Sequence, residues 1–217
     1  MPGIDSATVV LVVPDAKRAE DFQALLASVH LECLRFRSGV EALAGLRAQS
    51  WGCMLVHVAG LDCSTPEFQR LLASRWIRLP TVYLTESTTV AETVAAFHAG
   101  AADFLEFPCN DQRLIDSVHR ALDASRRAWR DRERREDCAH RFRGLTPRER
   151  DVMEPMVRGW PNRRIADALS VSEKTVEVYR ARVIRKTGAG NLPGLMRMAI
   201  RAGLFEPGPR WHGHGSG

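Results

Sequence analysis

A stretch near the C-terminus, residues 172–186 (SEKTVEVYRARVIRK), carries the side chains best suited to binding an anionic ligand. Read as a helix at about 100° per residue, it places Val176 and Val183 on one side, with Tyr179 at the flank. The opposite side is cationic and has the small Ala181 at its middle. Basic side chains bind the phosphates of nucleic acids, and a small residue between them lets a helix approach base edges. Taken alone, the pattern also fits a solvated, charged surface helix.

The cationic side divides into two groups of candidate contacts. Glu177 could accept a hydrogen bond from cytosine N4, and Val178 could contact a thymine methyl group. The role of Arg180 stays open, because this residue lies close to the apolar side of the helix. Candidates for phosphate contacts are Lys174, Thr175, Arg182, Arg185 and Lys186, and candidates for base contacts are Glu177, Val178 and Ala181.

The residues that precede this stretch predict the elements that position it. Thr146 and Glu149 form a capping-box pattern around a proline, which predicts the start of a helix. A short helix is predicted over 161–169, and a break at 170–171 follows it. Two short helices joined by a tight turn, the second basic on its outer side, are typical of a helix-turn-helix motif. Residues 191–203 supply a further helix that can close the core.

Three motifs of this region, LTPRERDVM, GWPNRRIA and SEKTVEVYR, resemble the C-terminal DNA-binding domain of the LuxR/NarL/FixJ transcription factors. The residue pattern of these motifs is most similar to that of the FixJ branch, and the resemblance covers residues 143–205 without a gap. It implies a four-helix domain that binds promoter DNA, a homodimer on paired half-sites, and contact with RNA polymerase. Tyr179 departs from the pattern, because many members of the family have His there.

The first half of the chain alternates apolar runs with amphipathic segments. Such alternation predicts a doubly wound α/β domain with a parallel sheet and helices on both faces. In sheets of this kind, ligand chemistry gathers at the carboxyl ends of the strands. Strands are predicted over 8–13, 31–36, 53–58, 81–84 and 104–107, and helices over 18–29, 39–47, 66–72 and 90–99.

The predicted strand ends resemble those of a receiver domain, of the CheY/flavodoxin-like fold, in which most of the residues for phosphoryl transfer have been replaced. Receivers take a phosphoryl group on an Asp after the third strand, with Mg²⁺ held by acidic residues after the first strand, a Lys after the fifth and a Thr or Ser after the fourth. Here the acidic pair becomes Pro14-Asp15, the acceptor becomes His57 and the Lys becomes Phe107, while the Thr is kept as Thr85. Phe104 matches a residue that shifts with that Thr on activation.

These replacements argue against conventional aspartyl phosphorylation. Mg²⁺ needs several oxygen ligands, and Asp15 alone cannot replace three carboxylates. Phe107 cannot neutralise a phosphoryl group, so phosphate on the His57 imidazole would lack its stabilising cations. Asp62 is a substitute acceptor, but it lies in the loop beyond the strand end.

His57 has three interpretations, which the sequence leaves open. It can be a packed histidine that fills the former acidic pocket beside Phe107. It can be a pH-sensitive switch with Asp15 as its partner. It can also bind a metal with Asp15 and a neighbouring cysteine, although no ligand spacing supports this.

Charge separates the two halves of the 217-residue chain. Residues 1–137 carry 16 Lys and Arg against 19 Asp and Glu, and residues 138–217 carry 15 against 7, which gives the overall net charge of +5. The excess of positive charge therefore lies with the helix-turn-helix, as phosphate binding requires. The expected domains are a receiver-like domain over 1–124, a charged helical linker over 125–143, the DNA-binding domain over 144–206 and a disordered tail over 207–217.

These features predict a cytoplasmic, sequence-specific DNA-binding transcriptional regulator, an atypical response regulator that is independent of conventional Asp phosphorylation. Two alternatives stay open: a two-component regulator with an unusual acceptor and a cognate sensor kinase, and an antagonist that sequesters proteins through its receiver surface. We expect no membrane segment, metal or other cofactor. No nucleophile–base pair or phosphate-cradling loop indicates an enzyme.

Overall fold

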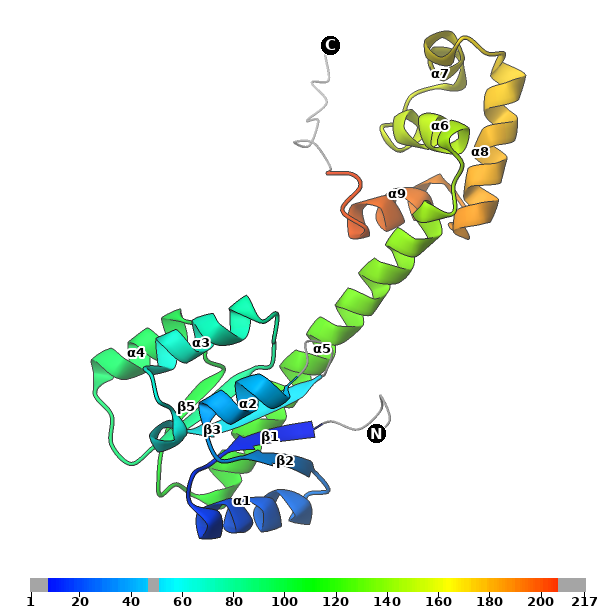
Figure 1. The fold of residues 1–217 in the computed structure, drawn as a ribbon. Coiled ribbons are helices and arrows are strands. Elements are labelled where there is room, and N and C mark those ends of the chain that lie inside the picture. The colour runs from blue at the N-terminus through cyan, green and yellow to red at the C-terminus, as the bar shows by residue number, and fades with distance from the viewer. Residues whose placement is uncertain (1–7, 47–50, 207–217) are drawn as a thin grey trace, which may run out of the picture. The chain divides into compact units, whose positions relative to one another are not determined.

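The computed structural model describes residues 8–46 and 51–206. The chain divides into two compact units, Met1–Trp129 and Arg130–Gly217 (Figure 1). The predicted disordered tail over 207–217 lies outside the described residues.

The N-terminal unit is built on a five-stranded parallel sheet with the strand order β2-β1-β3-β4-β5. This confirms the doubly wound fold that the alternation of apolar and amphipathic segments predicted. The strands are β1 (Thr8–Val12), β2 (Glu32–Phe36), β3 (Gly52–His57), β4 (Thr81–Thr85) and β5 (Asp103–Glu106). The helices are α1 (Ala16–Ser28), α2 (Gly39–Gly45), α3 (Thr65–Ser74), α4 (Val90–His98) and α5 (Asp111–Arg143), with a 3₁₀ turn, η1 (Val58–Gly60), after β3.

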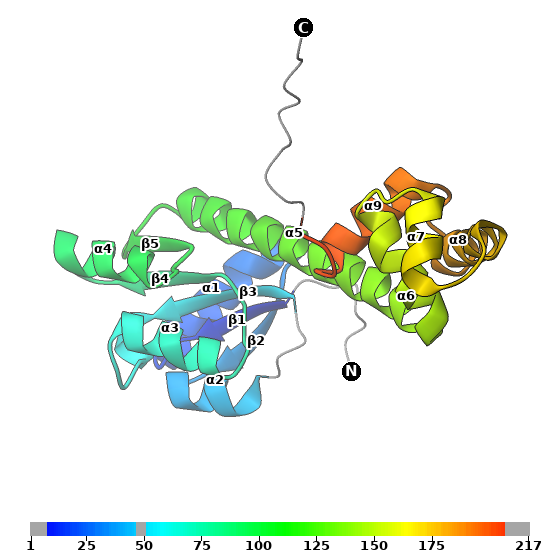
Figure 2. The ribbon, with the colours of Figure 1, turned by 90° about the horizontal axis from the view of Figure 1, so that it is seen from above.

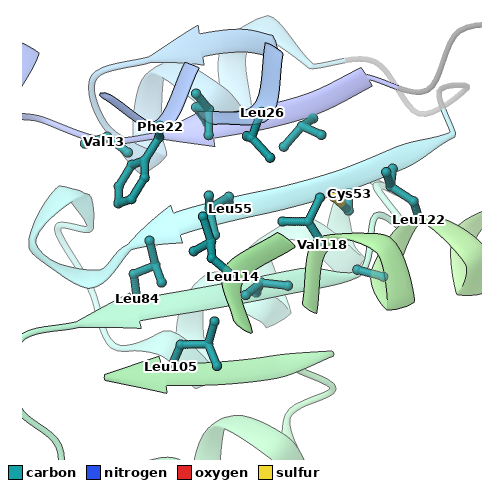
Figure 3. Packing of buried hydrophobic residues seen from close by; sticks show 14 of the residues in the cluster. Val13, Phe22, Leu26, Cys53, Leu55, Leu84, Leu105, Leu114, Val118 and Leu122 are labelled. Carbon is teal, nitrogen blue, oxygen red and sulfur yellow. The ribbon is translucent and has the colours of Figure 1, made fainter. Parts of the chain in front are cut away.

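Alternate residues of the strands enter two separate cores. Val9 and Leu11 of β1 face one core, which contains the apolar sides of α1 and α5, while Val10 and Val12 face the other, with α2 and α3. The alternation follows from the pleat of a strand, whose successive side chains point to opposite faces. Figure 2 shows α2 and α3 on one side of the sheet and α5 on the other. Figure 3 shows the first core, where Leu114 and Val118 of α5 lie against Leu55 of β3.

Several element boundaries differ from the predicted ones by one or two residues. Helix α1 begins at Ala16 rather than at residue 18, because the Asp15 carboxylate accepts the backbone N–H of Arg18 and caps the helix. Strand β3 ends at His57, and Val58 belongs to η1. Helix α2 ends at Gly45, before the segment 47–50 that lies outside the described residues.

Helix α5 is 33 residues long and contributes side chains to the cores of both units. Ser125 is buried in the N-terminal unit, where its hydroxyl accepts the backbone N–H of Gly52 at 3.1 Å. In the C-terminal unit, Cys138 is buried and Phe142 packs into the core. The segment predicted as a charged helical linker, 125–143, therefore holds packed residues near both of its ends.

The C-terminal unit contains the four predicted helices, α6 (Pro147–Val157), α7 (Asn162–Leu169), α8 (Glu173–Thr187) and α9 (Leu192–Arg201). The Thr146–Glu149 capping box is present at the start of α6, as its sequence pattern predicted. The tight turn between α7 and α8 uses Ser170 in the left-handed conformation, with φ of 54° and ψ of 47°. Met156, Ile165 and Leu195 bring α6, α7 and α9 together around the buried side of α8.

Candidate nucleic-acid interface and receiver pocket

Helix α8 lies with one apolar stripe in the core of the C-terminal unit. The hydroxyl of Ser172 caps the helix by accepting the backbone N–H of Thr175 at 3.1 Å. Val176 and Val183 are fully buried, and Tyr179 is half-buried beside them. Hydrophobic burial of this stripe holds the helix in one rotation about its axis, so its other side faces outward.

The outward side contains the predicted contact residues on one continuous surface. Val178 keeps 43% of its surface exposed, so its apolar side chain is accessible at the centre of a charged helix. Thr175 and Arg180 are half-buried at the edges of this surface. The exposed members are Lys174, Glu177, Val178, Ala181, Arg182, Arg185 and Lys186.

Two of these basic side chains contact neighbours on the same helix. Lys174 Nζ lies 3.4 Å from Glu177 Oε2, and both side chains are more than half exposed. The guanidinium carbon of Arg182 lies 5.7 Å from the ring centroid of Tyr179. Exposed pairs of this kind contribute at most about 1 kcal/mol, so a phosphate could replace them at little cost.

Lys186 differs from the other basic residues, because its ammonium group is bound to a buried carboxylate. Its Nζ donates to Glu149 Oε2 at 2.8 Å, and Glu149 is only 3% exposed. The same carboxylate oxygen accepts the backbone N–H of Thr146 at 2.8 Å. The hydrogen bond from Lys186 lowers the pKa of Glu149 below its ordinary range; burial opposes this shift, and the bonds to Thr146 add to it. Lys186 thus joins the end of α8 to the start of α6, and its phosphate contact stays a prediction.

The receiver pocket is organised around an arginine that the sequence analysis did not identify. His57, at the end of β3, is 3% exposed, and its Nε2 lies 2.7 Å from Nη1 of Arg18 in α1. Arginine can only donate, so Nε2 accepts and the ring proton is on Nδ1. That Nδ1 is buried and has no hydrogen-bond partner in the part of the chain that the structure describes.

Arg18 also contacts the segments that follow the two neighbouring strands. Its Nη1 donates to Glu86 Oε1, after β4, at 2.9 Å. Its guanidinium carbon lies 5.0 Å from the ring centroid of Phe107, after β5, and Phe107 packs edge-on against Phe22. A single cationic side chain therefore contacts the ends of three strands.

The electrostatics of this cluster favour the neutral form of His57. Burial lowers the pKa of His57 below its ordinary value of 6.5, and the positive charge of Arg18 lowers it further. The charges of Glu86 and Asp15 act in the opposite direction with smaller effect. The interpretation of His57 as a packed side chain fits this geometry, with Arg18 rather than Asp15 as its direct partner.

The other predicted pocket residues, Pro14, Asp15, Thr85 and Phe104, make local contacts within the fold. The Asp15 carboxylate is used as the cap of α1, and Pro14 before it has no acidic group. The Thr85 hydroxyl donates to the carbonyl oxygen of Ser87 at 2.7 Å. Phe104 packs on Tyr83 in the core on the α2 and α3 side of the sheet, opposite to Phe107.

The sequence also left open a metal site at His57 and a substitute phosphoryl acceptor at Asp62. Asp62 is exposed in the loop between η1 and α3. Within residues 8–46 and 51–206, no group of three or more His, Cys, Asp or Glu side chains could hold a metal ion.

A receiver-like sheet domain followed by a helix-turn-helix domain defines a class of protein, the response regulators that act on transcription. The chain matches the family described as bacterial regulatory proteins of the luxR family over residues 143–199. It belongs to the LuxR/FixJ-type response regulators.

Relatives resemble the chain over nearly its whole length. It is 34% identical over 200 residues to the transcriptional regulatory protein FixJ of Azorhizobium caulinodans, covering 92% of this chain and 95% of the relative. For FixJ of Rhizobium meliloti the identity is 37% over 199 residues, with 91% and 97% covered.

Solved structures agree with this assignment. A structure of the response regulator StyR has a TM-score of 0.80 at 28% identity, with 90% of this chain and 99% of that chain covered. Full-length FixJ from B. japonicum has a TM-score of 0.53 at 32% identity, with 92% and 98% covered. No helix among the described residues is both long and apolar enough to cross a membrane.

Proposed function

We propose that this response regulator binds specific DNA sequences by placing α8 in a major groove. The observation that carries the proposal is the division of α8 into a fully buried apolar stripe and an outward cationic surface with Ala181 and Val178 at its centre. Relatives that match the chain over most of its length are named transcriptional regulatory proteins, which supports a role at promoters.

The contacts of α8 divide by chemistry. Charged and hydroxyl groups at the rim bind phosphates and set the register, whereas central side chains meet base edges. Arg180 is half-buried, and we assign it to the edge of the interface. We assign phosphate contacts to Lys174, Thr175, Arg182 and Arg185, and base contacts to Glu177, Val178 and Ala181.

Selection of bound sequences from a random duplex library, followed by fluorescence anisotropy, tests this proposal. The purified protein should bind the selected sequence at least about 10³-fold more tightly than a scrambled duplex. Equal affinity for both duplexes at all salt concentrations would refute sequence-specific recognition.

The regulator is independent of conventional Asp phosphorylation in our proposal. The end of β3 carries an imidazole, and the nearest cation, Arg18, is already bound to His57 and Glu86. Asp15 is the only carboxylate of the former acidic pair, and it caps a helix. Incubation with acetyl phosphate and Mg²⁺, followed by intact mass measurement, should show no stoichiometric adduct. An adduct mapped to Asp62 or His57 would support the alternative of an unusual acceptor.

The N-terminal unit serves as a dimerisation module in our proposal. Helix α4 exposes Val90, Val94 and Phe97, with 83%, 47% and 45% of their surfaces accessible. Their i, i+4, i+7 spacing places them on one side of the helix, where a second copy could cover them. Analytical ultracentrifugation of the full chain should show a dimer that Val94→Asp weakens, and an unchanged dimer in that variant would assign the interface elsewhere.

A further inference from the structure

A stacked arginine at the start of α7 is the strongest unassigned feature of the C-terminal unit. The guanidinium carbon of Arg164 lies 3.9 Å from the ring centroid of Trp160, the closest such contact among the described residues. Trp160 is half-buried and packs against the core, whereas Arg164 is exposed. The indole therefore provides a fixed platform on which the guanidinium lies.

Stacking leaves the hydrogen-bonding edge of the guanidinium free. The guanidinium carbon lies over the indole ring, and the N–H donors of a guanidinium lie in its own plane and point outward from its edge. Other arginines of the same unit use that edge within the fold: Arg158 donates to Glu154 at 2.8 Å, and Arg141 Nε lies 3.0 Å from Asp137. No ion pair or hydrogen bond of the described residues occupies the donors of Arg164.

The place of Arg164 in the fold suggests what these donors meet. Helix α7 is the first helix of the helix-turn-helix and packs on α8 through Ile165 and Ala166, which are buried. In such motifs the first helix crosses the sugar–phosphate backbone while the second enters the groove. A cation on α7 that faces the duplex would therefore meet a phosphate rather than a base edge.

We propose that Arg164, held over the ring of Trp160, binds a phosphate of the DNA backbone outside the groove that α8 enters. This inference rests on the proposed DNA binding and adds a contact that lies off the recognition helix. A guanidinium fixed in advance loses little rotamer freedom on binding, and its parallel donors match two phosphate oxygens. Arg164 thereby fixes the orientation of the domain on the duplex without reading its sequence.

The experiment measures the affinity of the full chain for its selected duplex and for a scrambled duplex, across a range of salt concentrations. Arg164→Ala should weaken both complexes by a similar factor, about tenfold, and reduce the slope of log K against log salt by about 0.9 per protomer. Arg164→Lys should restore the slope but not the full affinity, because lysine keeps the charge and lacks the planar pair of donors. Arg197→Ala, which removes an exposed arginine from α9, is the matched control and should leave the slope unchanged.

Trp160→Leu distinguishes the contribution of the Trp160 ring from that of the Arg164 charge. This variant should keep the salt slope of the unaltered protein and lose part of the affinity, because Arg164 remains charged but is no longer held in place. Thermal melting of each variant shows whether an affinity loss follows from unfolding.

Several outcomes would overturn the inference. An Arg164→Ala variant with unchanged affinity and slope would show that the stack only stabilises the fold, even though the protein binds DNA. Equal slope losses in Arg164→Ala and Arg197→Ala would show a general effect of net charge. If the unaltered protein binds no duplex at low salt, the proposed function fails and this inference fails with it.

Discussion

Removal of the Lys186 ammonium should destabilise the C-terminal unit rather than weaken a contact with DNA. The Glu149 carboxylate is 3% exposed when Lys186 is present, and in Lys186→Ala it keeps only the backbone N–H of Thr146 as a hydrogen-bond donor. A buried acceptor that loses a charged partner costs about 1–3 kcal/mol. The opposite change, Glu149→Gln, should cost less, under about 1 kcal/mol, because the new amide oxygen still accepts from Thr146. Lys186, whose side chain is 38% exposed, can then turn to water.

Hydrogen exchange measured by mass spectrometry on the full chain detects this difference locally. Amides of α6 and α8 should exchange roughly 5- to 150-fold faster in Lys186→Ala, while peptides of the β-sheet stay unchanged. Lys174→Ala breaks an exposed ion pair of the same helix and should change the free energy of local opening by at most about 1 kcal/mol. This variant therefore provides a matched lysine control.

Two results would refute the reasoning. One is unchanged exchange in α6 and α8 of Lys186→Ala. The other is a fall of about 0.9 in the salt slope of DNA binding, which would assign Lys186 to a phosphate after all.

Glu149 also sets a pH dependence whose sign follows from its lowered pKa. A carboxyl whose pKa is lower in the folded state than its ordinary value of 4.5 stabilises the fold above that value. The stabilisation is lost as the pH falls through the folded-state pKa. Glu149→Gln should remove this part of the acid sensitivity, which a denaturant midpoint measured between neutral and acidic pH would show.

Further expectations concern the pocket and the interface. Arg18→Ala should raise the pKa of His57, because the charge of Arg18 lowers it; an NMR titration of the His57 ring protons that shows no rise would contradict this. His57 itself should cost stability as the pH falls from above 6.5 toward its folded-state pKa, because the unfolded chain takes up the proton first; His57→Gln should flatten this part of the stability curve, and an equally steep curve would count against it. Lys174→Ala should weaken binding to all duplexes alike and reduce the salt slope, whereas Val178→Ala should change preference at particular bases. Equal losses on selected and scrambled DNA for both variants would refute that division.

Local patterns were sufficient to predict the elements and the buried side of α8. The apolar run of β1 reads as a strand buried on both faces, and four of its five residues are buried. The capping box of α6 and the i, i+7 spacing of Val176 and Val183 depend only on near neighbours, so the sequence displays them directly. The same reasoning assigned Glu149 to a cap and Lys186 to DNA. Glu149 and Lys186 are 37 positions apart in the sequence, so no local pattern reveals their ion pair.

Arg18 shows why the chemistry of the pocket could not be predicted in the same way. In the sequence it is one charge in AKRAED, a segment typical of the exposed side of a helix. Its partners His57 and Glu86 lie 39 and 68 residues away, and only the parallel order of the strands brings them together. The burial of an imidazole in place of a carboxylate leaves the pocket with no negative charge at the end of β3 for a metal ion to neutralise. The positive charge of Arg18 is instead paired with Glu86, and its guanidinium lies over the ring of Phe107. A lysine at position 107 would be repelled by the guanidinium of Arg18. The replacements at His57 and Phe107 are therefore linked through Arg18, and a His57→Asp substitution alone would place a carboxylate beside Arg18 without restoring a metal site.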